Sequence, residues 1–202
     1  MKKCFLAEFF EVKNMNYIEE IKKYKPYNIQ EKKDKELILK CIEKYNNILT
    51  RENPLVHITS SGYIVNKDFT KVLMVFHNIY NSWSWTGGHA DGDCDLLKVA
   101  IKEAKEETGI KNIKPLSKDI FSLDVITVEG HIRKGEYVSS HLHLSICYLL
   151  QGDERDLLKI KEDENSGVKW IPIEEVDKYS TEEKMIKIYN KFHKKIKESH
   201  IV

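Results

Sequence analysis

Three glutamates near the end of a helix-forming segment are the strongest candidates for a chemical site. Glu103, Glu106 and Glu107 stand at i, i+3 and i+4, so a helix brings them to one face. Like charges at these spacings cost about 0.2–0.5 kcal/mol per pair, and anions in the last turn cost about 0.3–1 kcal/mol each. A divalent cation would compensate for both costs, and an all-oxygen cluster favours Mg²⁺ or Mn²⁺ over zinc or copper. The alternative is a solvated acidic face on a surface helix.

A glycine pair ahead of this helix favours the metal hypothesis. Gly87 and Gly88 let the backbone approach a ligand closely, and the carbonyl of Gly88 could complete an octahedral site. The turn 91–93 follows, and Asp93 is the expected N-cap of a helix over about 95–108. The pattern therefore predicts a loop with exposed backbone that leads into an acidic helix.

The segment 87–110 resembles the Nudix box, G-x5-E-x7-R-E-U-x-E-E-x-G-U, in which U is an aliphatic residue. Gly88, the three glutamates, Gly109 and Ile110 match this pattern. Two positions depart from it, because Cys94 stands where the family has its first Glu and Lys102 stands where it has Arg. In the family these two side chains help to hold the loop and the helix in place. The departures therefore bear on the catalytic rate and leave the metal cluster intact.

The resemblance implies a Mg²⁺-dependent hydrolase, with Mn²⁺ as a substitute, that cleaves a pyrophosphate bond in a nucleoside diphosphate linked to another moiety. The implied metal ligands are Glu103, Glu106, Glu107 and the backbone of Gly88, and Glu103 and Glu106 are also implied to be catalytic. The family's general base is either a box glutamate or a carboxylate on a later loop. We therefore expect Glu164, in the acidic stretch 161–165, to be a catalytic residue.

Two other functions are possible for a protein of the same fold. Cys94 and Lys102 motivate a catalytically weak or inactive nucleotide-binding module as the alternative to the hydrolase. Isomerase chemistry on a prenyl diphosphate is the third hypothesis, but the sequence has no paired Cys/Glu constellation that supports it. The identity of the nucleotide stays open at this point.

Several residues near the box are candidates for contacting the substrate. His89 directly follows the glycine pair, Trp83 could stack on a nucleobase, and Lys102 could touch phosphate. His141 and His143 point to the same face if their segment is a strand. Each has a structural alternative, which is a solvated lysine, a core tryptophan or a pair of partly buried histidines.

The helices and strands around these candidates can be predicted from the pattern of apolar residues. Helices are expected over 16–24 and 30–46, strands over 55–66, 71–77, 83–85, 120–129, 137–150 and 168–171, and a terminal helix over 173–198 with Met185, Ile188, Tyr189, Phe192 and Ile196 as its apolar stripe. The first two strands form a hairpin through the turn 66–68. This order predicts an α/β (α+β) fold of the Nudix type, a mixed β-sheet sandwiched between helices. The domain covers 55–202, after an N-terminal helical extension over 1–54.

Composition limits the partners of the chain. Its 202 residues carry 33 Lys and Arg against 32 Asp and Glu, so bulk charge does not favour polymeric nucleic acid or an anionic membrane. No apolar run is long enough to cross a membrane, and Glu8 and Glu11 interrupt the N-terminal stretch that resembles a signal peptide. Four scattered cysteines suit a reducing compartment, so we expect a cytoplasmic protein. The expected partner is a small nucleotide-type substrate. The extension could cover the core or form a homodimer contact.

Overall fold

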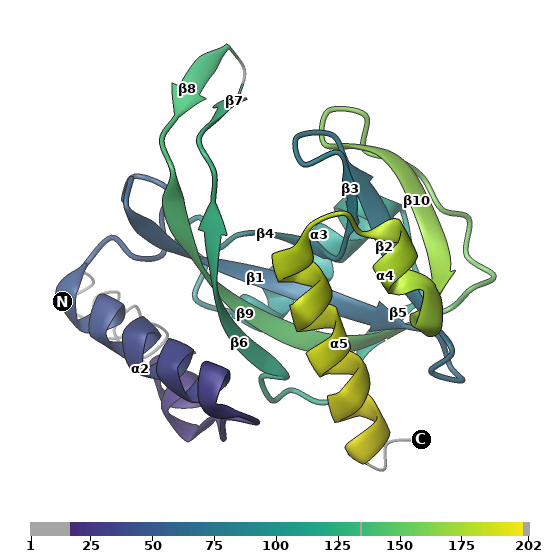
Figure 1. Ribbon diagram of the computed structural model, residues 1–202, viewed down its shortest axis with the longest axis horizontal. Coiled ribbons are helices and arrows are strands. Elements are labelled where there is room, and N and C mark those ends of the chain that lie inside the picture. Colours follow the sequence, from purple (N-terminus) through teal and green to yellow (C-terminus); the bar gives the residue numbers. More distant parts are fainter. Residues whose placement is uncertain (1–16, 134, 200–202) are drawn as a thin grey trace, which may run out of the picture. The chain divides into compact units, whose positions relative to one another are not determined.

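The computed structural model describes residues 17–133 and 135–199, and it is a mixed α+β structure (Figure 1). Residues 17–23 are helical, and the elements that follow are α2 (Ile29–Lys44), β1 (Val56–Val65), β2 (Lys71–His77), β3 (Ser82–Ser84), β4 (Thr86–His89), α3 (Leu96–Thr108), β5 (Ile113–Pro115), β6 (Ser122–Val128), β7 (His131–Arg133), β8 (Glu136–Val138), β9 (His141–Gly152), β10 (Asn165–Pro172), α4 (Val176–Tyr179) and α5 (Glu183–Glu198), with a 3-10 turn over Ile173–Glu175 before α4. The N-terminal stretch that resembles a signal peptide lies outside the described residues.

The described residues divide into two compact units. The first unit comprises residues 17–60, 88–99 and 119–147, and the second comprises 61–87, 100–118 and 148–199. The boundaries fall inside β1, β4, α3 and β9, so these four elements contribute residues to both units.

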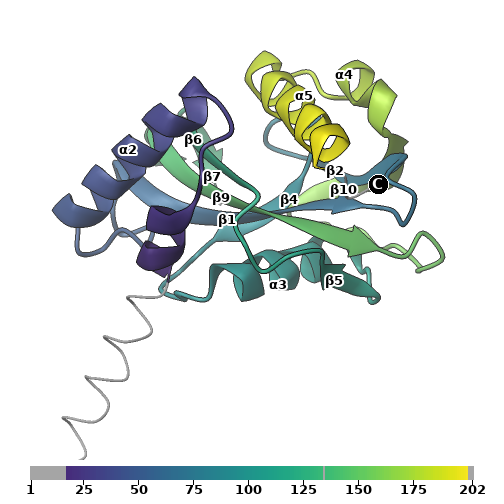
Figure 2. The ribbon, with the colours of Figure 1, turned by 90° about the horizontal axis from the view of Figure 1, so that it is seen from below.

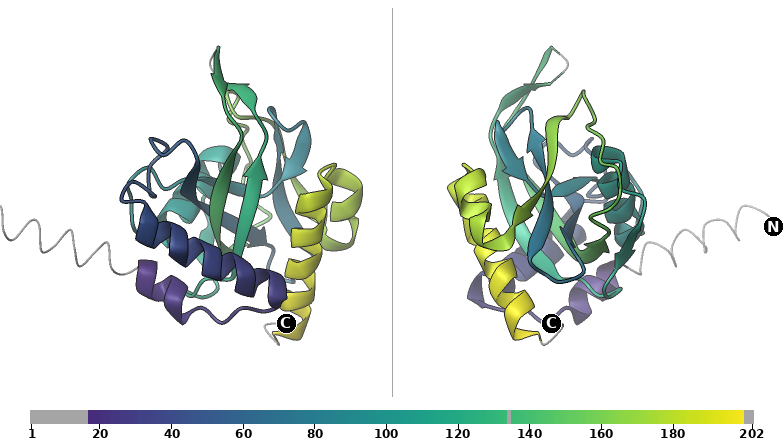
Figure 3. Two further views of the ribbon diagram at one scale, coloured as in Figure 1. Left: turned by 60° about the vertical axis from the view of Figure 1, so that its left-hand side comes forward. Right: turned by 90° about the vertical axis from the view of Figure 1, so that its right-hand side faces the viewer.

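In the first unit, β6 pairs antiparallel with the first half of β9, from Ser122 opposite Cys147 to Val128 opposite His141. Helix α2 lies beside β6, as Figure 3 shows. It is fixed there by polar contacts, because the Gln30 amide donates to the Asp124 carboxylate at 3.1 Å and the Ser122 hydroxyl donates to Glu31 at 2.9 Å. Polar contacts therefore help to hold α2 on the strand, and Glu31, Ser122 and Asp124 make them from buried positions.

In the second unit, β10, β2, β1, β9 and β5 pair in this order, and β3 pairs with β2. Figure 2 shows α5 on one face of this part of the sheet and α3 on the other. The α5 face is an aromatic core, in which Trp85 stacks on Phe192 with ring centres 5.4 Å apart and Tyr63 meets Phe192 edge-on at 5.0 Å. Four members of the expected apolar stripe are buried, and Ile188 is only half-buried.

Three expectations about the elements were wrong. The terminal helix is not continuous, because the chain leaves the helix after Tyr179 and resumes it at Glu183. The glycine pair lies in β4 and not in a loop, since pairing with β1 makes this backbone extended. The segment expected as one strand over 137–150 is two strands with a break at residues 139–140.

Candidate active site

Asp95 is the N-cap of helix α3, which begins at Leu96. The Asp95 carboxylate accepts from the Lys98 backbone N–H at 3.1 Å, which is the N-cap to N3 bond that satisfies a free donor of the first turn. The expectation that Asp93 caps the helix was wrong, because Asp93 instead accepts from the Asp95 N–H at 3.0 Å and pairs with the Lys98 ammonium at 2.9 Å. The other end of the helix stops at Gly109, whose φ of 71° is the left-handed value expected just past a helix.

Glu107 is the most buried of the three box glutamates, with 5% of its surface exposed. Its carboxylate oxygen Oε1 accepts a hydrogen bond from the backbone N–H of Gly87 at 3.0 Å. Burial raises the pKa of Glu107 to about 8, although the Gly87 N–H opposes this shift, and the charges of Glu103 and Glu164 raise it further. A carboxylate held in this way is not part of a solvated acidic face.

Glu103 and Glu106 share one lysine. The Lys102 ammonium lies 3.2 Å from Glu103 Oε1 and 3.6 Å from Glu106 Oε1. The Glu103 side chain is 13% exposed, whereas Glu106 is 43% exposed and Lys102 is 58% exposed. Because Lys102 is largely in water, these pairs contribute at most about 1 kcal/mol to stability. Lys102 nevertheless stands where the family has its orienting Arg, and it bridges the two glutamates beside it.

The acidic stretch 161–165 lies against this cluster within the second unit. The Lys161 ammonium is 3.8 Å from Glu106 Oε2 and 3.0 Å from Glu164 Oε1, so one cation links the box to the expected general base. The buried Asn165 side chain donates to the Glu107 backbone carbonyl at 2.9 Å and thereby holds this stretch on the last turn of α3. The structure thus brings Glu103, Glu106, Glu107 and Glu164 together, with two lysines among them.

The two tryptophans pack on other aromatic rings. Trp83 is half-buried and meets Phe76 edge-on at 5.6 Å and Tyr179 edge-on at 6.2 Å. Trp85 is 9% exposed and belongs to the α5 core. A role for Trp83 in stacking on a nucleobase therefore stays a prediction, and its partial exposure is what keeps this role available.

Gly88 and Cys94 belong to the first unit, whereas the box glutamates belong to the second. Gly88 directly follows Gly87 in β4, and Gly87 is the residue whose N–H donates to Glu107. Cys94 is half-buried and carries a free thiol. The carbonyl of Gly88 as a metal ligand stays a prediction.

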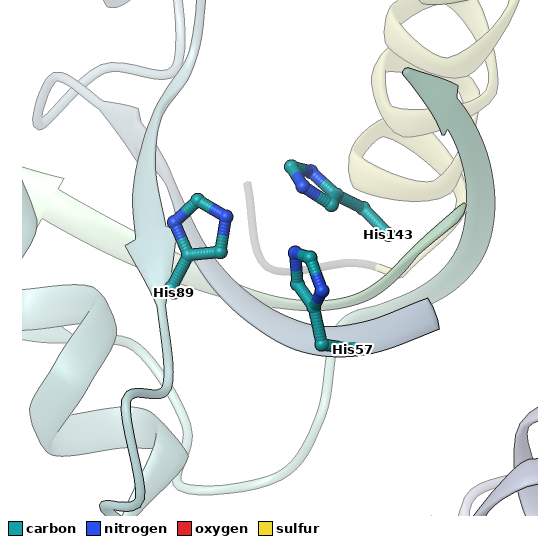
Figure 4. A group of neighbouring side chains, drawn as sticks. All are labelled: His57, His89 and His143. Atoms are coloured by element: carbon teal, nitrogen blue, oxygen red, sulfur yellow. The ribbon is translucent and has the colours of Figure 1, made fainter. Parts of the chain in front are cut away.

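His89 lies in a cluster of imidazole rings in the first unit, together with His57 of β1 and His143 of β9 (Figure 4). His141 and His143 do share a face of β9, and their Nε2 atoms are 3.1 Å apart. Burial lowers the pKa of His143 to about 2, and the neighbouring histidines His89, His57 and His141 lower it further. Burial also lowers the pKa of His57. These two rings are therefore neutral at physiological pH.

Three residues that take part in these arrangements escaped the sequence reasoning. Lys161 and Asn165 flank Glu164, and their proximity to it was the available signal, although nothing local indicates that they reach α3. His57 carries no signal in the sequence, because its neighbours in the cluster lie 32 and 86 positions away along the chain. A cavity of about 570 Å³ lined by residues within 26–39 contains none of the candidate residues.

No helix among the described residues is both long enough and apolar enough to span a membrane.

Comparison with known proteins gives a consistent result. Residues 56–192 match the family model of the NUDIX domain. A similar curated protein is an RNA pyrophosphohydrolase of Pelagibacter ubique (strain HTCC1062), which is 30% identical over 140 residues that cover 67% of this chain and 87% of the relative.

Two solved structures show the same fold at low sequence identity. One is a C. elegans Ap4A hydrolase in a binary complex, with a TM-score of 0.51, 20% identity and coverage of 69% of this chain and 97% of that chain. The other is a Nudix hydrolase from M. smegmatis, with a TM-score of 0.52, 9% identity and coverage of 72% and 88%.

Proposed function

The chain belongs to the Nudix family of pyrophosphohydrolases, and we propose that it uses Mg²⁺ to cleave a pyrophosphate bond in a nucleoside diphosphate linked to another moiety. The observation that carries this proposal is the gathering of the three box glutamates, one of them buried and fixed by the Gly87 N–H, around the end of α3. A buried carboxylate whose pKa is raised destabilises the fold at neutral pH, so its presence calls for a functional reason.

The donor set fits a hard divalent cation. Nudix hydrolases generally use a divalent metal, and Glu103, Glu106 and Glu107 offer only carboxylate oxygens, which Mg²⁺ and Mn²⁺ prefer. The ammonium groups of Lys102 and Lys161 form ion pairs with Glu103 and Glu106. When bound, a divalent cation polarises the phosphoryl group and lowers the pKa of a coordinated water.

The residues of the chain then have distinct tasks. The Gly87 N–H keeps Glu107 aimed away from bulk water, and Lys102 holds Glu103 and Glu106 side by side. Glu164 is the carboxylate we propose as general base, because Lys161 ties it to Glu106 and because it lies on a loop outside the box. As general base, the Glu164 carboxylate would accept a proton from the attacking water.

The test is a panel of nucleotides incubated with the full chain and Mg²⁺ or Mn²⁺, with identification of the products. The panel contains ADP-ribose, dinucleoside polyphosphates, nucleotide sugars and nucleoside triphosphates. We expect cleavage at a pyrophosphate bond and a loss of at least about 100-fold in kcat for Glu106→Gln, which keeps the size of the side chain and removes its charge. A panel without products from a protein that still binds Mg²⁺ would contradict the hydrolase proposal and favour the binding module.

A second candidate substrate is the 5′ end of an RNA. It is favoured by the printed name of the 30% identical relative, an RNA pyrophosphohydrolase. The balanced charge of the chain argues for contacts confined to the terminal nucleotides, because phosphate contacts along a polymer need a basic surface. A short 5′-triphosphorylated RNA in the same panel distinguishes the two, through its rate relative to the small nucleotides and through the salt dependence of that rate.

Two further parts of the proposal concern the setting of the enzyme. Cys41 and Cys94 carry free thiols, as the cysteines of a cytoplasmic protein would. A homodimer through the N-terminal helices stays a prediction, which light scattering on the full chain would test.

A further inference from the structure

We propose that His57, His89 and His143 form a second metal site, which binds Zn²⁺ or a similar transition-metal ion through three imidazole nitrogens. The three rings come from three strands, β1, β4 and β9, and converge on one space within the first unit (Figure 4). One ring nitrogen from each histidine lies within 4.8 Å of the others. The inference does not rest on the proposed function, because none of these residues is a box glutamate.

The spacing of the rings matches three-fold coordination. The ring centres of His57 and His89 are 4.9 Å apart, and those of His57 and His143 and of His89 and His143 are each 5.0 Å apart. A tetrahedral ion about 2.0–2.1 Å from each nitrogen would place the ring centres about 5.2 Å apart. The rings therefore stand at nearly the required separation, and binding calls mainly for rotation of the imidazoles and little movement of the strands.

Hydrogen bonds leave His57 ready to act as a ligand. Its Nδ1 lies 3.0 Å from the backbone carbonyl of Asn53, which can only accept, so Nδ1 carries the proton and Nε2 keeps its lone pair. The residue is 4% exposed, and Nε2 is buried without a hydrogen-bond partner. An unpaired buried acceptor destabilises the fold, and a bound metal ion would remove this cost. A metal-ligating histidine that donates its other N–H to a carbonyl is the common arrangement at such sites.

His141 orients His143 by the same kind of contact. Its Nδ1 donates to the Ser139 carbonyl at 2.8 Å, so its Nε2 is the acceptor for the His143 Nε2–H at 3.1 Å. This leaves Nδ1 of His143 with a lone pair. We therefore assign His141 a positioning role and His143 the role of ligand.

The donor set distinguishes this site from the box. Imidazole nitrogens suit Zn²⁺, Co²⁺ and Ni²⁺, whereas carboxylates suit Mg²⁺ and Mn²⁺. Three protein ligands leave the fourth position of a tetrahedral ion open, as in catalytic zinc sites, so water or an anionic oxygen of a ligand could occupy it.

The experiment uses the full chain without a histidine tag, treated with a chelator and then dialysed. We expect calorimetric titration with Zn²⁺ to show one site per chain, and Co²⁺ to give the visible absorption of a tetrahedral ion without a thiolate charge-transfer band. His89→Gln, at a half-buried position, should weaken Zn²⁺ binding by at least about 10–100-fold, the loss that even outer-shell partners cause. His131→Gln is the matched control, because His131 is a histidine of the same unit outside the trio, and it should bind as the unaltered chain does.

Several results would overturn the assignment. They are an absence of Zn²⁺ binding, equal affinities in His89→Gln and His131→Gln, or a Co²⁺ spectrum of octahedral type. Circular dichroism and thermal unfolding of each variant establish that a lost site is not a lost fold. Glu106→Gln, which tests the hydrolase, should leave Zn²⁺ affinity unchanged, so failure of one proposal can be separated from failure of the other.

Discussion

Replacing Glu107 by Gln should stabilise the metal-free protein while it damages the metal site. Gln has the same shape, and its side-chain oxygen can still accept from the Gly87 N–H. With Gln at this position, folding no longer has to bury the charge of Glu107 or protonate its carboxylate. The effect should therefore depend on pH, because Gln does not titrate and Glu107 does.

The magnitude follows from the raised pKa of Glu107. The pKa of Glu107 is about 8 in the folded chain, against 4.5 ordinarily. Its contribution to the free energy of unfolding is therefore fully present below pH 4.5 and is lost as the pH rises through 8. At pH 7 the folded state has lost about 3 kcal/mol by this linkage, and at pH 5 only about 1 kcal/mol. Glu107→Gln escapes the loss, so it should raise the melting temperature at pH 7 by about 6–12 °C in a chain of this length.

The assay is thermal and urea unfolding of both proteins in chelator at pH 5, 6, 7 and 8. Glu106→Gln is the matched control, because its carboxylate is 43% exposed and its replacement should change stability by no more than about 0.5 kcal/mol. Adding Mg²⁺ should stabilise the unaltered chain more than Glu107→Gln. A Glu107→Gln protein that is no more stable than the unaltered chain at pH 7, or whose advantage does not grow with pH, would contradict this prediction.

Three further predictions concern the same region of the chain. Glu164→Gln should lower kcat by about 100-fold with little change in KM, whereas Glu162→Gln, an exposed neighbour, should leave both unchanged; equal effects in steady-state kinetics would remove Glu164 from the mechanism. Lys102→Arg places a planar guanidinium group between Glu103 and Glu106 and should raise kcat several-fold in the same assay. An unchanged rate would mean that lysine orients the two glutamates as effectively as arginine does. Gly109→Ala should lower the free energy of unfolding in urea by about 2 kcal/mol or more, because the new Cβ would lie 2.9 Å from Lys159 Cβ and the backbone would be strained at φ 71°. Gly92→Ala is the control, because it carries only the backbone strain of about 1 kcal/mol.

Local patterns in the sequence were sufficient for the elements and for the acidic cluster. The period of apolar residues predicted α3, and the spacing of three glutamates on one helix face needs no tertiary contact to be recognised. The hairpin of β1 and β2 followed from two apolar runs around a turn, and β1 and β2 do pair antiparallel. The family resemblance of the box also depends only on residues within 24 consecutive positions.

Errors arose where a contact with a distant segment decided the local structure. Pairing of β4 with β1 makes the glycine pair extended, although a Gly-Gly sequence is typical of a loop. Asp93 was the expected cap, and only the hydrogen bond from the Lys98 backbone N–H shows that Asp95 caps the helix instead. In both cases the propensity is weak and can be overridden by about one hydrogen bond.

Burial and long-range convergence belong to the tertiary structure alone. Glu107 has the same residue type as Glu106, yet it is 5% exposed and has a raised pKa because of what the folded chain packs around it. Lys161 reaches the box, and His57 joins His89 and His143, only because strands and loops far apart in the chain are brought into register. Sequence spacing describes distances along one element, whereas the environment that sets the chemistry of these side chains is made by residues from several elements.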